Sequence, residues 1–299
     1  MAEQTHFYCI ADLLLELNLP YEARLSEILS NFEPFRISER SSSKTSCVIS
    51  IIEEDLDFNF EEGKLLSDIS IVWGDRFTFY ETSNYYWTLI ESELIPDTHW
   101  KMRSTKDFKE NVIYCGNINE MKNNFISWYC MVAFAQSSLL HNCVLIHSSV
   151  VMNDEFGYGF LGKSGTGKST HSRLWLKYNM GFKLLNDDNP AVRIMDSGEV
   201  FVFGTPWSGK TPCYVNDVRP LKGLVRLKQA PQNIFDIRKN KDALLAILPS
   251  CSAIRWNLNL YSTLINILVD IINKVPIAEL QCLPDEGAAY LCYSELRKL

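Results

Sequence analysis

The chain has 299 residues, of which 46% are hydrophobic and 22% are charged, so it can bury a substantial core and is not a disordered segment. Its net charge of −7 excludes a general nucleic-acid-binding protein, because such a protein needs a basic surface to neutralise phosphates. The nine cysteines form no CxxC pair, which argues against a zinc ribbon and is typical of buried thiols in a reducing compartment.

The N-terminus lacks the basic and apolar stretches of a secretory signal. The most apolar windows, 125–135 and 264–272, are shorter than the roughly 20 residues that a membrane-spanning helix needs. We therefore expect a cytoplasmic protein that has neither a membrane nor a nucleic acid as its partner.

Residues 1–115 have the pattern of a small α/β module. Two short helices are predicted over 11–17 and 21–31, and β-branched residues predict a strand over 47–52. The aromatic residues of this module are interpreted as one half-buried sheet face, because aromatic side chains favour strands. Nothing in the module indicates a chemistry, so its role stays open. Three further strands, which should form a meander, are expected over 69–72, 76–81 and 85–89.

A second domain is predicted over 116–299, and it begins with a helix. Apolar residues three and four apart indicate this helix over 117–140. A strand over 143–152 and another over 158–161 are separated by a short turn, which predicts a hairpin. This hairpin leads directly into a glycine-rich loop.

The glycine-rich loop fits the pattern G-x-x-x-x-G-K-[ST] at every position. The glycines of such a loop turn successive N–H groups inward around phosphates, its lysine reaches the β- and γ-phosphates, and its last hydroxyl is a ligand of Mg²⁺. A helix predicted over 170–179, starting at Thr170, points its positive N-terminal end at the same phosphates. We therefore interpret this stretch as a site for ATP and Mg²⁺ rather than a plain turn. The loop consists of Gly162, Lys163, Ser164, Gly165, Thr166, Gly167, Lys168 and Ser169.

Two adjacent carboxylates, Asp187 and Asp188, end a short strand predicted over 183–188. Such a pair can bind a divalent cation and accept a proton from a hydroxyl group. On its own, the pair would favour a solvated turn before Pro190. Because the glycine-rich loop is only one helix and one turn away, we expect a functional pair.

A single histidine, His147, lies in the apolar strand that precedes the hairpin turn. Such a histidine is more often a satisfied core residue than a catalytic one. Its strand is paired with the strand that feeds the loop, however, so the side chain can reach the phosphates. The segment 204–210 is equally compatible with an ordinary turn and with a loop in which Trp207 covers a ligand.

The remaining pattern continues as short strands and helices. A hairpin is predicted over 192–203, a strand over 221–227, and helices from 242 and over 260–273. A hairpin precedes the loop, and the strand over 183–188 follows the loop's helix after only a tight turn. These short connections predict a mixed sheet with antiparallel character. Four arginines are candidates for stabilising charge in a transition state, and the sequence does not choose among Arg219, Arg226, Arg238 and Arg255.

The run 145–149, the loop with its preceding strand and the Asp187–Asp188 pair resemble the HPr kinase/phosphorylase family, which shares its catalytic fold with ATP-dependent phosphoenolpyruvate carboxykinase. The resemblance is strong only over 140–195. It implies an α/β (α+β) fold with a P-loop core and a mixed sheet, beside the smaller N-terminal module. It also implies that Lys168 holds the transferred phosphate and that Ser169 binds magnesium.

The same resemblance implies that Asp188 is the base that takes the proton from the acceptor hydroxyl, that Asp187 supports metal or water, and that His147 is a catalytic auxiliary. The family signature that follows the carboxylates, a metal-binding glutamate and then Arg-Gly, is replaced here by the stretch 203–210. The second magnesium ligand, HPr as the acceptor and the reverse phosphorylase reaction are therefore not implied.

The sequence thus predicts a kinase that uses ATP and Mg²⁺ to phosphorylate a serine-type hydroxyl of a protein or a small metabolite. Its expected partners are the nucleotide and this acceptor, and a homo-oligomer is compatible with the sequence. Two alternatives stay open: a nucleotide-binding regulatory module without transfer activity, and a carboxykinase-like enzyme.

Overall fold

The computed structural model describes residues 4–20, 25–54, 56, 63–72, 75–92, 95–116, 124–209 and 211–299. Contacts divide the chain into two compact units, Met1–Ser138 with Ile254–Leu260 and Leu139–Ala253 with Tyr261–Leu299. The sequence set the boundary after residue 115, whereas the contacts group the helix α2 (Asn124–Ser137) with the first unit. Within the described ranges, no helix has both the length and the apolar character needed to cross a membrane.

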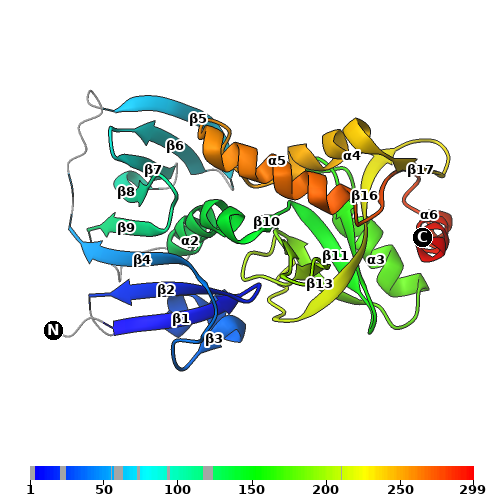
Figure 1. Ribbon diagram of the computed structural model, residues 1–299, viewed down its shortest axis with the longest axis horizontal. Helices are drawn as coiled ribbons and strands as arrows, with labels where there is room; N and C mark the ends of the chain where they lie inside the picture. Colours follow the sequence, from blue (N-terminus) through cyan, green and yellow to red (C-terminus); the bar gives the residue numbers. More distant parts are fainter. Residues whose placement is uncertain are drawn as a thin grey trace. The chain divides into compact units, whose positions relative to one another are not determined.

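The first unit is built on a mixed sheet with the strand order β3-β1-β2-β4-β9-β8-β7-β6-β5 (Figure 1). Strand β4 is parallel to β2 and to β9, and the other pairs are antiparallel. The strand predicted over 47–52 and the predicted meander are confirmed. The strands are β1 (Gln4–Ile10), β2 (Leu13–Leu19), β3 (Arg36–Ile37), β4 (Thr45–Glu53), β5 (Lys64–Val72), β6 (Asp75–Glu81), β7 (Tyr85–Ser92), β8 (Ile95–Thr105) and β9 (Glu110–Cys115).

The helix predicted over 11–17 is wrong, because this stretch is a turn followed by strand β2. Ala11 and Asp12 both have positive φ, 52° and 56°, which is the backbone of a two-residue hairpin turn. Leu14 is buried on the second face of the sheet, so the alternation that identifies a half-buried strand is limited to the last residues of β2, where Glu16 and Asn18 alternate with leucines. Of the helix predicted over 21–31, residues 21–24 lie outside the described residues, and the rest forms only α1 (Leu25–Ile28) and a short 3-10 turn, η1 (Ser30–Phe35).

The second unit also has a mixed sheet, with the strand order β10-β14-β15-β16-β12-β11-β13. Strand β16 is parallel to β12 and to β18, β17 is antiparallel to β18, and the remaining pairs are antiparallel. The mixed sheet that the sequence predicted is therefore confirmed. The strands are β10 (Cys143–Leu145), β11 (Ser148–Met152), β12 (Gly157–Leu161), β13 (Lys183–Asp188), β14 (Ala191–Ile194), β15 (Val200–Phe203), β16 (Val218–Gln229), β17 (Ile234–Arg238) and β18 (Ile277–Cys282).

The predicted strand over 143–152 is in fact two strands that separate at residues 146 and 147. Strand β10 pairs with β14, whereas β11 pairs with β12 and β13. At the break, the N–H of Ile146 donates to the carbonyl of Pro190, and the N–H of His147 donates to the carbonyl of Ser250 at 2.6 Å. Both strands are fully buried, and the polar residues at the break, His147 to Ser149, are compatible with one continuous strand, so the sequence does not reveal the separation.

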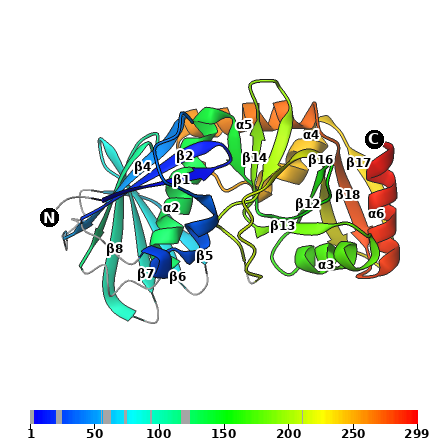
Figure 2. The same ribbon diagram turned by 90° about the horizontal axis from the view of Figure 1, so that it is seen from below.

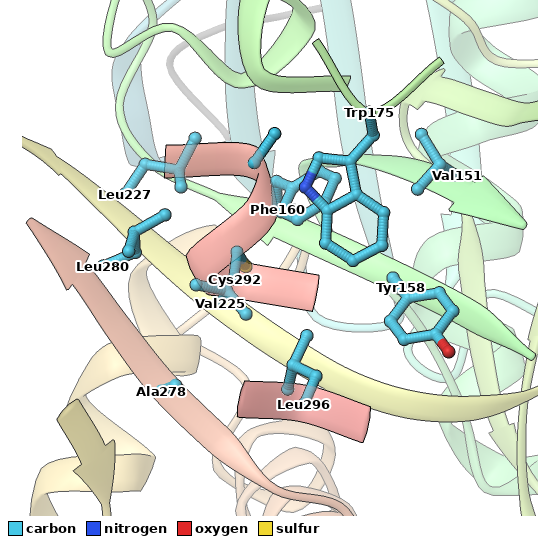
Figure 3. Packing of buried hydrophobic residues seen from close by; sticks show 11 residues of the cluster. Val151, Tyr158, Phe160, Trp175, Val225, Leu227, Ala278, Leu280, Cys292 and Leu296 are labelled. Atoms are coloured by element: carbon cyan, nitrogen blue, oxygen red, sulfur yellow. The ribbon is translucent and has the colours of Figure 1, made fainter. Parts of the chain in front are cut away.

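Helices α3 (Lys168–Tyr178) and α6 (Glu286–Lys298) pack together on one face of this sheet, and α4 (Asn240–Ile247) lies on the opposite face (Figure 2). Helix α5 (Leu258–Ile272) precedes β18. Trp175 of α3 lies at the centre of the core, with its ring 5.1 Å from that of Tyr158 and 5.2 Å from that of Phe160 (Figure 3). Burial of these large rings fixes α3, and thereby the loop before it, against the sheet.

Candidate active site

The glycine-rich loop joins the end of β12 to the start of α3. Gly165 and Gly167 have φ of 80° and 104°, in the left-handed region that glycine adopts without strain. The N–H of Thr166 donates to the carbonyl of Lys163 at 3.1 Å, and the Thr166 hydroxyl donates to the same oxygen. Gly167 is the N-cap of α3 and has no side chain that could cap the first turn. The positive end of α3 is therefore open toward the loop, as an anion-binding helix end requires.

The other polar residues of the loop lie at its surface. Lys163, Ser164 and Gly165 are exposed. Thr170, in the first turn of α3, accepts a hydrogen bond from Arg173 at 3.5 Å. The predicted phosphate-binding stretch is thus accessible to solvent along its outer edge.

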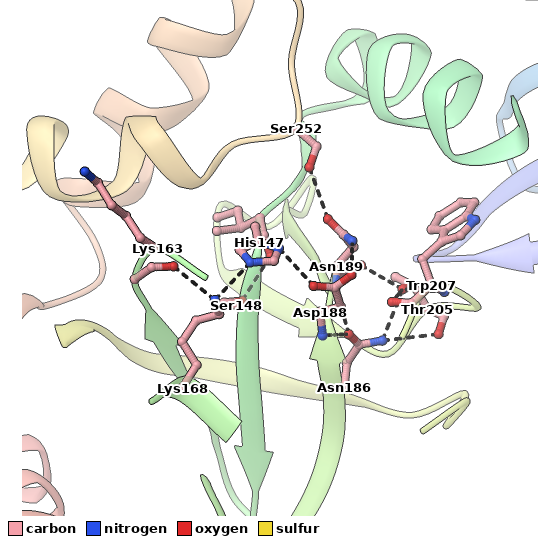
Figure 4. A network of polar contacts seen from close by, with 12 residues as sticks. His147, Ser148, Lys163, Lys168, Asn186, Asp188, Asn189, Thr205, Trp207 and Ser252 are labelled. Atoms are coloured by element: carbon pink, nitrogen blue, oxygen red, sulfur yellow. Dashed lines mark hydrogen bonds and ion pairs between the residues drawn. The ribbon is translucent and has the colours of Figure 1, made fainter. Parts of the chain in front are cut away.

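The three predicted catalytic residues form one connected chain (Figure 4). The ammonium of Lys168 lies 2.9 Å from Nε2 of His147 and 3.0 Å from the carbonyl oxygen of Gly162. On the other side of the imidazole, Nδ1 lies 2.9 Å from Oδ1 of Asp188. A carboxylate accepts and an ammonium donates, so these partners place the imidazole proton on Nδ1 and leave Nε2 as an acceptor. The arrangement is a cation, a neutral imidazole and an anion in a row.

Burial lowers the pKa of the Lys168 ammonium, and the carboxylates of Asp188 and Asp187 act in the opposite direction. The cation is therefore partly stripped of water while two nearby negative charges support its charged form. A partly desolvated cation interacts more strongly with phosphate oxygens than a fully hydrated one.

The two adjacent carboxylates point to different faces of the sheet. The strand register places Asp187 opposite Ser149 and Asp188 opposite Ser148. The hydroxyl of Ser149 lies 2.6 Å from that of Ser172 on α3, so this is the face that α3 covers. Directly opposed residues share a face and successive residues alternate. Asp187 thus faces α3, and Asp188 faces the other side, where it meets the imidazole.

The residues expected to bind magnesium fit that ion. Ser169 lies in the first turn of α3, and Asp187 lies on the sheet face that α3 covers. Asp187 is 7% exposed, and among the described residues no hydrogen bond reaches its carboxylate. A hydroxyl and a carboxylate are the oxygen donors that magnesium prefers beside water and phosphate. The described residues contain no group of three His, Cys, Asp or Glu side chains placed to hold a metal.

A buried asparagine that the sequence analysis did not single out holds the turn that carries Asp188. Oδ1 of Asn186 accepts from the backbone N–H of Asp188 at 3.0 Å and from that of Asn189 at 3.1 Å. Its Nδ2 donates to the carbonyl of Thr205 at 3.2 Å. An asparagine that bonds the backbone two residues ahead is a recognised turn signal, and the Asn-Asp-Asp-Asn sequence contains it.

The segment 204–209 lies against the carboxylate pair, and Lys210 lies outside the described residues. Ser208 forms a β-bridge with Asp188, and the N–H of Gly209 donates to the carbonyl of Asp187 at 3.0 Å. A Cβ at Gly209 would lie 2.8 Å from that same oxygen, so the close approach requires glycine. Trp207 is 4% exposed, which leaves its indole little surface to bury over a ligand.

A cavity of about 270 Å³ opens beside the loop and brings one of the candidate arginines to the site. The neighbours of Arg226 on β16, Val225 and Leu227, pack on the side of α3, so Arg226 points to the opposite face, where it donates to the carbonyl of Ala246. The cavity is lined by His147, Gly162, Lys163, Arg226, Pro249, Ser250, Cys251 and Ser252.

The other candidate arginines have different surroundings. Arg219 donates to Asp217, and Arg238 pairs with Glu279 at 2.9 Å. Arg255 belongs to the first unit. Of the four, the structure therefore places Arg226 at the cavity beside the loop.

No family model and no curated protein matches this chain. Among solved structures, the chain is similar to the HPr(Ser) kinase/phosphatase from Coxiella burnetii, with 14% sequence identity and a TM-score of 0.31. The match covers 52% of this chain and 88% of that one. A similarity of this size carries no argument about activity, so the functional conclusion depends on the site itself.

Proposed function

We propose that this protein is an ATP- and magnesium-dependent kinase of the HPr kinase type that transfers a γ-phosphoryl group to a hydroxyl group. The observation that carries the proposal is the chain from Lys168 through His147 to Asp188, which connects the lysine of a phosphate-binding loop to a carboxylate base. The nucleotide and a hydroxyl-bearing acceptor, either a protein or a small metabolite, are the partners that we propose, and the cytoplasm is the proposed compartment.

The loop and the start of α3 supply the phosphate site. Backbone N–H groups and the helix N-terminus bind phosphate oxygens, and the Lys168 ammonium binds the group that is transferred. Ser169 and Asp187 would hold magnesium, which neutralises negative charge on the phosphates when it is bound. The protein thereby positions the phosphoryl group and screens the charge that would otherwise repel a nucleophile.

Asp188 is the proposed base. Its carboxylate takes the proton of the acceptor hydroxyl, the oxygen bonds to the γ-phosphorus, and the bond from this phosphorus to the β–γ bridging oxygen breaks to release ADP. His147 donates from Nδ1 to Asp188 and so holds the carboxylate in place. The carboxylate has further lone pairs with which to accept the proton.

Arg226 and the cavity beside the loop are the proposed acceptor side of the site. A cavity of about 270 Å³ has the volume of roughly nine water molecules, which suits a side chain or a small metabolite. The Arg226 guanidinium provides a fixed positive charge on its wall for the oxygens of the moving phosphoryl group.

The decisive experiment separates binding from transfer with two variants. Asp188→Asn keeps the size of the side chain but cannot take a proton, so phosphoryl transfer should fall about 10²-fold or more while Mg-ATP binds within several-fold of the parent. Asp187→Asn should do the reverse and weaken metal-nucleotide binding more than the chemistry. Calorimetry with Mg-ATP and measurement of ADP release, with and without free serine, test both expectations.

Asp154→Asn is the matched control, because Asp154 is exposed in the turn before β12 and should behave like the parent. If both site variants turn over ATP like the parent, the carboxylate pair is a turn and the mechanism is wrong. If the parent binds Mg-ATP but never releases ADP with any acceptor, the protein is a nucleotide-binding regulatory module.

A further inference from the structure

Both polar atoms of the Asn189 side chain have a partner next to the site (Figure 4). Nδ2 donates to Oδ2 of Asp188 at 2.9 Å, and Oδ1 accepts from the hydroxyl of Ser252 at 3.1 Å. A carboxylate can only accept and a serine hydroxyl can donate, so these partners determine which amide atom points in which direction. Asn189 is 7% exposed, so little water can replace either bond.

The carboxylate of Asp188 is consequently held on both of its oxygens. His147 donates to Oδ1 and Asn189 donates to Oδ2, each at 2.9 Å. The terminal torsion of an aspartate is broad, so one hydrogen bond would leave the carboxylate plane free to turn. Two donors on different oxygens fix this plane and therefore the direction of the remaining lone pairs.

The backbone of Asn189 is itself rigidly supported. Its N–H is shared between Oδ1 of Asn186 at 3.1 Å and the carbonyl of Trp207 at 3.2 Å. Its carbonyl accepts from the hydroxyl of Thr205 at 2.7 Å. A donor on such a support holds its partner more accurately than one on a mobile loop.

We infer that Asn189 is a positioning residue of the phosphotransfer, which fixes the carboxylate plane of Asp188 so that a free lone pair faces the acceptor hydroxyl; this inference rests on the proposed function. Ser252, which lines the cavity, bonds to the other end of the same amide. The wall of the acceptor cavity and the base are therefore connected through one side chain.

The test is a double-mutant cycle between Asn189 and the base. Asn189→Ala should lower kcat by about 10- to 100-fold, the effect of losing one hydrogen bond to a charged group, and leave the KM for Mg-ATP within about twofold. In the Asp188→Asn background the same substitution should lower the residual kcat by less than about threefold, because the group that it positions is no longer a base.

Two further variants keep the test specific. Ser252→Ala should lower kcat in the same direction but less than Asn189→Ala, because it removes only the outer partner of the amide. Asn233→Ala is the matched control: Asn233 donates to Asp285 at 3.0 Å in the same unit, so this variant loses an equivalent bond and should keep the parent kcat.

The outcomes are distinguishable. An Asn189→Ala variant with the parent kcat overturns the inference and leaves the kinase intact. An equal fold loss in both backgrounds also overturns it, because a merely structural role does not depend on the base. A parent without phosphotransfer overturns the proposed function and this inference with it.

Discussion

Each of the two units contains a lysine whose ammonium contacts protein groups, and the surroundings of the two ammonium groups differ. Lys101 of β8 is 4% exposed, and its ammonium donates to the backbone carbonyl of Leu56. Lys168 is only partly buried. Its ammonium contacts the carbonyl of Gly162 and the imidazole of His147, which in turn pairs with the carboxylate of Asp188. Burial of a charge is therefore not what marks a site. The Lys168 ammonium reaches a titratable histidine that lines an open cavity.

Buried asparagines show the same contrast. Asn111 in the first unit donates to the carbonyls of Phe108 at 2.8 Å and Val48 at 3.2 Å, and so it stabilises a turn in which Phe108 has a positive φ of 58°. Asn186 in the second unit also bonds to the backbone, but the turn that it holds carries Asp188. The same chemistry serves the fold in one unit and the site in the other.

Replacing each lysine by alanine should separate a role in the site from a role in the fold. The largest effect on activity is expected for Lys168. Lys168→Ala removes the ammonium that we propose binds the phosphates, so transfer should fall at least about 10³-fold and Mg-ATP affinity should drop. Lys101→Ala should instead lower the midpoint of urea unfolding and leave the turnover of the folded protein unchanged. The measurements are Mg-ATP binding by calorimetry, the rate of ADP release and the midpoint of urea unfolding for both variants. An active Lys168→Ala variant would contradict the interpretation of 162–169 as a phosphate-binding loop.

A smaller loss is expected at the cavity wall. Arg226→Gln removes a fixed positive charge from the wall of the cavity that we propose holds the acceptor, and it should lower kcat by about 10²-fold. Arg238→Gln is its matched control, since Arg238 pairs with Glu279 and does not line the cavity. Steady-state kinetics of the two variants should differ sharply. Equal kinetics would remove Arg226 from the site and leave the other expectations untouched.

A change at His171 of α3 is expected to affect stability in acid and not activity. This histidine is 3% exposed, accepts from Nε1 of Trp175 at 3.0 Å, and burial lowers its pKa to about 4. The unfolded chain binds the proton near pH 6.5 and the folded chain only near pH 4, so acid favours unfolding throughout this range. The second unit should lose about 3 kcal/mol of stability between pH 6.5 and pH 4.

The measurement is urea unfolding of the parent and of His171→Gln at several pH values. Glutamine can still accept from Trp175 but does not titrate, so the variant should lose less stability in acid than the parent. An identical pH dependence in both proteins would show that other groups control the acid sensitivity.

Much of the second unit could be predicted because its signals are local. The glycine pattern, the helix after it and the short return to Asp188 all lie within one continuous stretch of sequence. The place of Arg226 at the cavity could not be predicted, because it depends on the parallel pairing of β16 with β12, where Arg226 lies opposite Leu161. The support of Asp188 was also missed, because Asn186 and Asn189 look like ordinary turn residues until their partners are known.

The first unit was harder to predict for a related reason. Leu13, Leu14 and Leu15 are all buried, and polar residues alternate with buried leucines only at Glu16 and Asn18, so the period of two covers only the last part of this strand. The pairing partners of β2 come from different parts of the chain, because β4 begins at Thr45. Leucine-rich sequence alone cannot distinguish such a strand from a helix.

The separation of β10 from β11 has one more consequence, which concerns insertions and deletions. His147 lies where the chain leaves one set of neighbouring strands and joins another, so neither set dictates how its side chain points. A residue inserted or deleted between Leu145 and Ser148 would leave the registers of both strands in place but displace the His147 imidazole from Lys168 and Asp188. The spacing between these two residues is therefore expected to tolerate no change in length, even where the identity of the residues can vary.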